Sequence, residues 1–302
     1  MTYTPDELLK LIHDTGALSI WDRKKGPVFW YIAGVPGPFY INTELLLGAA
    51  LAKELLKGID NILANTPADD PAPRVSQLNG LILGAVKNSP VYQQIVTTMV
   101  DRAKKEFKAG SYSFISGGER RDWLFSIPFA KECGLKHVFL FKNKTIYCEQ
   151  PLQPQEAGLH IADLINNAVS YTDVWLPVLD KAGLKCGGTV CIISRGTDGV
   201  KKLEANGIKV IALNNIDLGF FERSQANGLI AAETLVEIAC HFASPKEWAR
   251  KYVMGNADVY NVNIIDAKSF ERLKSFFAND PWELRPKFGS FFAAMQKKIA
   301  AR

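Results

Sequence analysis

Three polar segments of this sequence combine residue types that can bind an anion. Residues 116–122 read Ser-Gly-Gly-Glu-Arg-Arg-Asp, residues 163–170 read Asp-Leu-Ile-Asn-Asn-Ala-Val-Ser, and residues 194–199 read Ser-Arg-Gly-Thr-Asp-Gly. Glycine lets a backbone approach a ligand closely, and arginine suits a phosphate or a carboxylate. Each segment also has a simpler interpretation, which is a polar turn exposed to solvent.

The second segment lies between an apolar stretch that ends on Asp163 and an amphipathic stretch that ends at Gly183. Ser170 and Asp173 have the Ser-x-x-acid spacing of a capping box, which predicts that a helix begins there. Free N–H groups at the start of a helix, together with its dipole, form an anion site that phosphate commonly occupies. An ordinary strand-to-helix connection explains the same residues.

The surrounding pattern alternates between strand and helix. The expected strands are 111–115, 137–142, 145–148, 159–163, 189–194 and 209–213, and the expected helices between them include 124–133 and 200–206. Such an alternation predicts right-handed βαβ units and a mostly parallel sheet. Ligands of open parallel sheets bind beyond the carboxyl ends of the strands, which is where the three polar segments lie.

Helical patterns flank this region on both sides. Before it we expect helices at 5–14 (capped by Thr4, with Pro5 in the first position), 43–63, 75–87 and 91–107, with residues 64–73 as a loop. After it we expect helices at 225–242, 245–254, 267–278 and 286–301. The expected organisation is an N-terminal segment of helices and short strands (1–110) that contributes to the core and a hood, an α/β core (111–224), and a C-terminal helical extension (225–302).

Composition limits the function classes. The chain has 302 residues, of which 47% are hydrophobic and 22% charged, and a net charge of +5. The basic residues are spread along the chain, so we expect no nucleic-acid partner. The apolar runs are too interrupted for a membrane span, and the start has no signal pattern. Five cysteines without a CxxC pair predict reduced thiols in a cytoplasmic protein.

The sequence lacks the residue motifs that several common enzyme classes require. The four histidines form no metal-binding spacing, so we expect no metal held directly by the protein. The sequence contains no HExxH, G-x-S-x-G or GxGxxG motif and no phosphate-binding P-loop. Hydride transfer and nucleotide hydrolysis of the usual kinds are therefore not expected.

In their order and spacing, five segments resemble the type I phosphoribosyltransferases, and within them the orotate phosphoribosyltransferase branch. They are residues 37–43, 115–123, 137–142, 161–170 and 193–199, and the likeness covers about 17–221. The resemblance implies a Rossmann-like α/β fold with a mostly parallel sheet of this family's kind. It also implies a transferase that moves a phosphoribosyl group from 5-phosphoribosyl-1-pyrophosphate (PRPP) to a pyrimidine-type base and releases pyrophosphate.

The same resemblance implies a cofactor, an assembly and a set of site residues. Mg²⁺ would bind through the PRPP pyrophosphate, and the protein would be a homodimer in pyrimidine biosynthesis. Asp163 would be catalytic by steadying the ribose, and Asn42 and Arg195 would contact the base. PRPP and pyrophosphate would be bound by Ser116, Gly117, Gly118, Glu119, Arg120, Arg121, Lys142, Asn166, Asn167, Ala168 and Ser170.

The sequence also departs from the family pattern. Ala162 stands where the first of two adjacent acids is expected, and residues 166–169 read Asn-Asn-Ala-Val in place of Thr-Thr-Gly-Gly. Without glycine a positive φ is costly at Val169, and close backbone approach to a phosphate is hindered. Residues 147–158 contain no lysine, which that branch uses in catalysis, and Ser194 replaces an acid. A second interpretation therefore stays open: a non-catalytic regulatory protein that binds a phosphorylated ribose or nucleotide.

Overall fold

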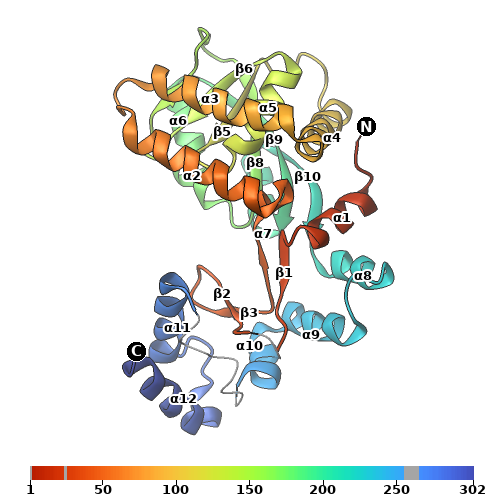
Figure 1. Cartoon of the computed structure of the whole chain (residues 1–302), viewed down its shortest axis with the longest axis vertical. Helices are drawn as coiled ribbons and strands as arrows, with labels where there is room; N and C mark the ends of the chain where they lie inside the picture. The colour runs from red at the N-terminus through yellow and green to blue at the C-terminus, as the bar shows by residue number, and fades with distance from the viewer. Residues whose placement is uncertain (1, 24–25, 255–264) are drawn as a thin grey trace. The chain divides into compact units, whose positions relative to one another are not determined.

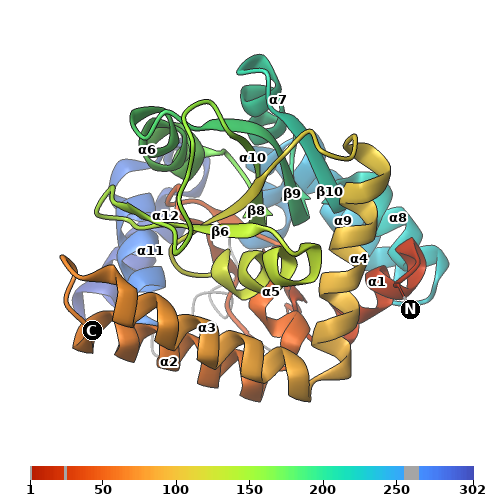
Figure 2. The same ribbon diagram turned by 90° about the horizontal axis from the view of Figure 1, so that it is seen from above.

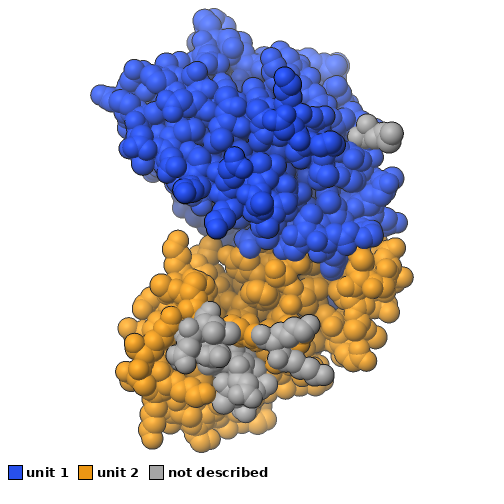
Figure 3. All heavy atoms as spheres, viewed as in Figure 1, with its two compact units in different colours: residues 1–17, 42–220 blue, residues 18–41, 221–302 orange. Residues whose placement is uncertain are grey.

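The structure is a computed structural model that describes residues 2–23, 26–254 and 265–302. Its contacts divide the chain into two compact units, coloured separately in Figure 3. Unit 1 comprises the N-terminal residues as far as Ala17 together with Asn42–Phe220. Unit 2 comprises Leu18–Ile41 and Phe221–Arg302. These units do not follow the three expected segments one for one, and the boundaries at 110 and 224 stay predictions.

Unit 1 is built on a six-stranded sheet with the strand order β10-β9-β8-β5-β6-β7 (Figure 1). The strands are β5 (Phe114–Gly118), β6 (Lys136–Leu140), β7 (Ile146–Tyr147), β8 (Ala157–Ile165), β9 (Lys185–Arg195) and β10 (Lys209–Ile216). All neighbours pair in parallel except β6 and β7, which form the expected hairpin. The mixed α/β fold with a mostly parallel sheet is confirmed.

Helices cover both faces of this sheet, as Figure 2 shows. On one face α4 (Pro90–Glu106) and α5 (Trp123–Cys133) contact the strands, and α2 (Ala49–Asn65) and α3 (Pro71–Asn88) form a further layer. On the other face lie α6 (Leu176–Lys181) and α7 (Asp198–Ala205). Between α6, α7 and the sheet is an apolar core that includes Phe114, Val138, Ala162, Tyr171 and Trp175.

Local signals explain where several helices begin and end. Helix α1 (Pro5–Asp14) has the expected cap: Thr4 Oγ1 accepts the Glu7 N–H at 3.3 Å, and the Glu7 carboxylate accepts the Thr4 N–H at 2.8 Å. The helix expected at 43–63 is instead a 3₁₀ turn (Thr43–Leu47) followed by α2, because Gly48 between them has a φ of 88°. The expected loop at 64–73 is too long, since α3 already begins at Pro71, a residue suited to a first helical turn.

Unit 2 has its own aromatic core. Two small antiparallel sheets pair β1 (Leu18–Ile20) with β4 (Phe39–Ile41) and β2 (Phe29–Trp30) with β3 (Pro36–Gly37). The helices are α9 (Ala232–Ala243), α10 (Pro245–Trp248) with a following π turn (Ala249–Val253), α11 (Ala267–Asn279) and α12 (Arg285–Ala300). Trp30, Trp248 and Phe277 are fully buried in this core.

The expected C-terminal helices are present with one difference. The helix expected at 225–242 is two helices, because α8 (Leu218–Ala226) ends before Gly228, whose φ is 70°, and α9 begins at Ala232. Within the described part of the chain, no helix is both long and apolar enough to cross a membrane.

Candidate functional site at the carboxyl ends of β5 and β8

The three polar segments of the sequence begin in the last residues of β5, β8 and β9, which are neighbours in the sheet, and continue into the loops that follow. The second and third are in direct contact: the Gly199 N–H donates to the Asn166 carbonyl oxygen at 3.1 Å. A Cβ at Gly199 would lie 2.2 Å from that oxygen, so only glycine allows this approach. The turn after β8 is therefore held against the start of α7.

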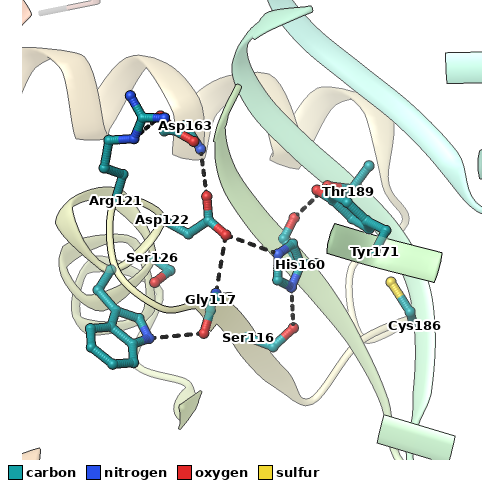
Figure 4. Close-up of polar contacts among 12 residues, drawn as sticks. Ser116, Gly117, Arg121, Asp122, Ser126, His160, Asp163, Tyr171, Cys186 and Thr189 are labelled. Carbon is teal, nitrogen blue, oxygen red and sulfur yellow. Dashed lines mark hydrogen bonds and ion pairs between the residues drawn. The ribbon is translucent and has the colours of Figure 1, made fainter. Parts of the chain in front are cut away.

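Asp122 joins the first segment to the second (Figure 4). Its Oδ2 accepts the Gly118 N–H at 3.2 Å, and its Oδ1 accepts the Asp163 N–H at 3.0 Å. One carboxylate thus connects the loop that follows β5 to the strand end that carries Asp163. The sequence placed Asp122 in the first polar segment without assigning it a role.

His160 lies behind Asp122 on β8. Its Nε2 is 3.5 Å from Asp122 Oδ2, and its Nδ1 is 3.0 Å from Ser116 Oγ (Figure 4). Ser116 and His160 are each only 1% exposed, so the Ser116 hydroxyl faces the protein interior. Thr189 Oγ1 donates to the His160 carbonyl at 2.8 Å, and the Tyr171 ring packs edge-on against the imidazole. His160 was not among the site residues expected from the sequence, although a histidine in an apolar strand three residues before an acid is a usable signal.

A second serine–histidine pair joins helix α5 to strand β6. His137 Nε2 is 2.9 Å from Ser126 Oγ, and among the described residues His137 Nδ1 has no hydrogen-bond partner. Burial, with a smaller effect of the nearby His160, lowers the pKa of His137 to about 3. His137 is therefore neutral at neutral pH.

Asp163, the predicted catalytic acid, is held by two side chains. Thr43 Oγ1 donates to its Oδ2 at 2.6 Å, and Arg121 Nε lies 3.4 Å from the same oxygen. The Asp163 residue is 6% exposed, and burial raises its pKa to about 7, against the opposing effects of Arg121 and Thr43. Burial therefore favours the protonated form of this carboxyl, whereas Arg121 and Thr43 favour its carboxylate form.

Arg121 is the cation of this site. It contacts Asp163 and also donates from Nη1 to Glu44 Oε2 at 3.2 Å. The Asp163 carboxylate is the main cause of a raised pKa at Arg121, and Glu44 adds to it. The structure thus brings Arg121 and Asp163 together, along with Thr43 and Glu44, which the sequence did not single out.

The other charged residues of the first segment point elsewhere. Arg120 donates to the carboxylate of Asp60 on α2. The Glu119 carboxylate accepts the Lys142 backbone N–H at 3.2 Å, while Lys142 itself is exposed. The Glu119 N–H donates to the Leu140 carbonyl at 2.9 Å, so this loop also runs along the end of β6.

Gly118 is required by close packing. A Cβ at this residue would lie 2.4 Å from the Trp175 ring and 2.8 Å from Asp122 Oδ2. At Gly117 a Cβ would lie 2.0 Å from Ser126 Oγ, and the Gly117 carbonyl accepts the Trp123 indole N–H at 2.9 Å. The two glycines therefore let α5 and Trp175 press against the strand end.

The turn after β8 differs from the expectation in two details. The positive φ falls on Ala168 (55°), and not on Val169. The capping box predicted for Ser170 and Asp173 is not formed: Ser170 is helical and makes no side-chain cap. Instead the chain enters a π turn (Tyr171–Trp175) before α6.

The remaining predicted residues lie at or near this edge. Asn166, Asn167 and Ser170 are exposed, and Asn167 Oδ1 accepts the Val169 N–H at 3.3 Å. Arg195 ends β9, paired with Ile216. Asn42 donates its N–H to the Ala17 carbonyl at 2.8 Å and directly precedes Thr43.

Comparison with known proteins gives matches in structure only. No family model matches the chain, and no curated protein matches its sequence. UMP synthase from Leishmania donovani is 12% identical with a TM-score of 0.54 over 80% of this chain, which spans only 42% of that protein. Orotate phosphoribosyltransferases from Francisella tularensis and Aeropyrum pernix give TM-scores of 0.48 and 0.46. They are 15% and 13% identical, cover 80% and 72% of this chain, and are covered over 97% and 99% of their own lengths.

Structural similarity at such low sequence identity is evidence for a shared fold and not for a shared activity. The order of the six strands, the helices on both faces and the polar loops at the carboxyl ends of β5, β8 and β9 define the architecture. The chain shares its α/β fold with the part of Leishmania donovani UMP synthase that it matches.

Proposed function

We propose that this protein is a phosphoribosyltransferase-type enzyme that binds PRPP at the carboxyl ends of β5 and β8. The observation that carries the proposal is the Asp122 bridge, which holds the Gly-Gly-Glu-Arg-Arg loop beside Asp163. An arginine-bearing loop and an acid at adjacent strand ends suit a sugar that carries phosphates. The transferred phosphoribosyl group would go to a pyrimidine-type base, with release of pyrophosphate.

The pyrophosphate would be bound mainly by side-chain charge. The N–H groups of Gly118 and Glu119 are already used by Asp122 and by the Leu140 carbonyl, so they do not point to a ligand. Arg120 and Arg121 are the cations of the loop, and fixed positive charge at a departing pyrophosphate is an effective form of transition-state stabilisation.

Arg121 would change partners when pyrophosphate binds. In the structure it shares its charge with Asp163 and Glu44. Drawing Arg121 toward a pyrophosphate would free Asp163 Oδ2 for the ribose hydroxyls, with Thr43 still donating to it. Asp163 would then stabilise the positive charge that develops at the anomeric carbon as the pyrophosphate leaves.

Mg²⁺ fits this site as an ion carried by the pyrophosphate. The Asp122 carboxylate accepts two backbone N–H groups, and Asp163 is engaged by Thr43 and Arg121. Mg²⁺ prefers oxygen ligands, and pyrophosphate oxygens and water can supply them. When bound, Mg²⁺ would neutralise charge on the pyrophosphate.

A binding protein without catalysis is the alternative, and one observation favours it. Ala162, which stands where a second ribose-facing acid is expected, is buried in the apolar core on the α6 side of the sheet. The site therefore has a single acid at the end of β8. A protein that recognises a phosphorylated ribose needs less charge than one that stabilises a transition state.

Titration calorimetry with PRPP and Mg²⁺, followed by a pyrophosphate-release assay, tests both possibilities. Release of pyrophosphate with orotate or another pyrimidine base supports the enzyme. PRPP binding without release for any of these bases supports the binding protein. Failure to bind PRPP would reject both. A homodimer is proposed from the family resemblance, and light scattering on the purified protein measures it directly.

A further inference from the structure

The Asp122 carboxylate has more partners than an ordinary loop acid. It accepts N–H groups from Gly118 and Asp163, which lie on two different strands, and it faces His160 Nε2. Its side chain is 13% exposed. A partly buried carboxylate needs such donors, because removing it from water is costly unless its oxygens are hydrogen-bonded.

The partners of His160 determine which ring nitrogen carries the proton. A proton on Nε2 points toward Asp122 Oδ2, whereas a lone pair there would face a negative charge. Nδ1 then accepts, and Ser116 Oγ, 3.0 Å away, donates to it. Ser116 thus bonds to His160, while His160 Nε2 has no hydrogen-bond partner among the described residues and lies 3.5 Å from Asp122 Oδ2.

The same three residue types form the nucleophilic triad of hydrolases, but here the serine is inaccessible. Ser116 lies within β5 and is 1% exposed, and its hydroxyl is directed at a histidine that is equally buried. A nucleophile must reach a substrate carbonyl, and this one cannot. The arrangement is suited to holding Asp122 in place.

We propose that Asp122 and His160 are positioning residues that fix the spacing between the pyrophosphate loop and Asp163. This inference rests on the proposed function and adds two residues to its site. Asp122 acts through the backbone N–H groups of Gly118 and Asp163. The buried His160 ring, whose Nε2 lies 3.5 Å from Asp122 Oδ2, limits where the Asp122 carboxylate can move. Both loops are thus set by one carboxylate that does not contact the ligand.

The variant Asp122→Asn is close to isosteric and tests the bridge. An asparagine side chain has a single acceptor oxygen, so it cannot accept both N–H groups, and its NH₂ would face one of them. We expect the amide proton signals of Gly118 or Asp163 to move upfield and to exchange faster in NMR spectra. We also expect the PRPP dissociation constant to rise by about tenfold, the loss typical of one charge-assisted hydrogen bond.

Ser116→Ala and Ser126→Ala form a matched pair for the role of His160. Each removes a hydroxyl bonded to a buried histidine, but only Ser116 is connected through its histidine to Asp122. We expect Ser116→Ala to change the ring-nitrogen signals of His160 and to weaken PRPP binding by about threefold, a loss of under 1 kcal/mol. Ser126→Ala should change only the His137 signals and leave PRPP affinity as in the wild type.

The outcomes separate this inference from the proposed function. Unchanged amide signals in Asp122→Asn would overturn the bridge, and altered signals with unchanged PRPP affinity would overturn its positioning role. Equal effects of Ser116→Ala and Ser126→Ala on affinity would overturn the role of His160, even if Asp122→Asn fails to fold. If the wild type binds no PRPP, the proposed function and the positioning of its ligand fail together, while the amide signals still report whether Asp122 joins the two loops.

Discussion

Arg121 Nε lies 3.4 Å from Asp163 Oδ2, so the cation expected to bind pyrophosphate and the acid expected to hold the ribose pair with each other. Glu44 and Thr43 complete this group. Any anion that binds Arg121 must compete with two carboxylates. The pair therefore ties the stability of the fold to the occupancy of the site.

Replacing Arg121 should affect stability and binding together. Arg121→Gln leaves the buried Asp163 without its cation, and we expect a loss of about 1–2 kcal/mol in the free energy of unfolding at pH 8, with weaker PRPP binding. Denaturant unfolding and calorimetry measure the two effects. Arg120→Gln is the matched control: its pairing with Asp60 is exposed, so we expect under about 1 kcal/mol of lost stability. If Arg120→Gln also leaves binding unchanged, only Arg121 serves the pyrophosphate.

Asp163→Asn should change how stability depends on pH. The pKa of Asp163 is about 7 in the folded protein, against about 3.9 in an unfolded chain. Its protonated form therefore favours folding, and this contribution is complete below about pH 4 and lost as pH rises through about 7. Asparagine does not titrate, so the variant lacks this loss of stability. The free energy of unfolding of Asp163→Asn minus that of the wild type should therefore rise between pH 4 and pH 8, by on the order of 1 kcal/mol or more. If the free energies of unfolding of the variant and the wild type change in parallel between pH 4 and pH 8, the raised pKa of Asp163 is contradicted.

Ala168→Gly tests whether the turn after β8 limits phosphate binding. Ala168 has a φ of 55°, which is costly for any residue with a Cβ, but its buried methyl group also contributes to the core. These effects oppose each other, so stability should change by less than about 1 kcal/mol. Removal of the methyl group lets the backbone come closer to a phosphate, and we expect tighter PRPP binding by calorimetry. Unchanged binding would show that the turn does not contact the phosphate.

Gly118→Ala should disrupt the loop. The added methyl group meets the Trp175 ring and Asp122 Oδ2, so either the ring or the loop must move. We expect a loss of about 1–3 kcal/mol in the free energy of unfolding, which is typical of overpacking. Gly187→Ala on β9 is the control, since its methyl group would meet its neighbours at 3.6 Å and 3.8 Å, which is ordinary contact. If both variants lose a comparable free energy of unfolding, the close packing at Gly118 is not the cause of the loss.

The sequence predicted those features that depend on local signals. Thr4, Pro5 and Glu7 mark the start of α1 because all the partners of the cap lie within four residues. The alternation of strands and helices indicated the parallel sheet and the order in which polar loops follow its strands. By contrast, the capping box at Ser170 had the right spacing, but the chain enters a π turn there and leaves the serine side chain uninvolved.

Residues that act across the sheet could not be identified in this way. Asp122 resembles any acid before a helix until β5 and β8 are known to be neighbours, because its partner Asp163 is 41 residues away. Thr43 and Asp163 are separated by 120 residues. Ser116 was expected to bind PRPP, and only the fold reveals that its hydroxyl points at His160. The ligand roles expected for Ser116 and Asp163 stay predictions until binding is measured.

The position of Thr43 and Glu44 has a practical consequence for fragments of this protein. A polypeptide beginning at residue 111 would contain every strand of the six-stranded sheet, yet it would lack the hydroxyl that binds Asp163 and the carboxylate that binds Arg121. At the carboxyl ends of its strands, Asp163 would lack Thr43 and Arg121 would lack Glu44. Truncation studies should therefore retain the chain from Asn42 onward, since the shortest polypeptide that keeps the complete ion network is set by those two residues and not by the first strand.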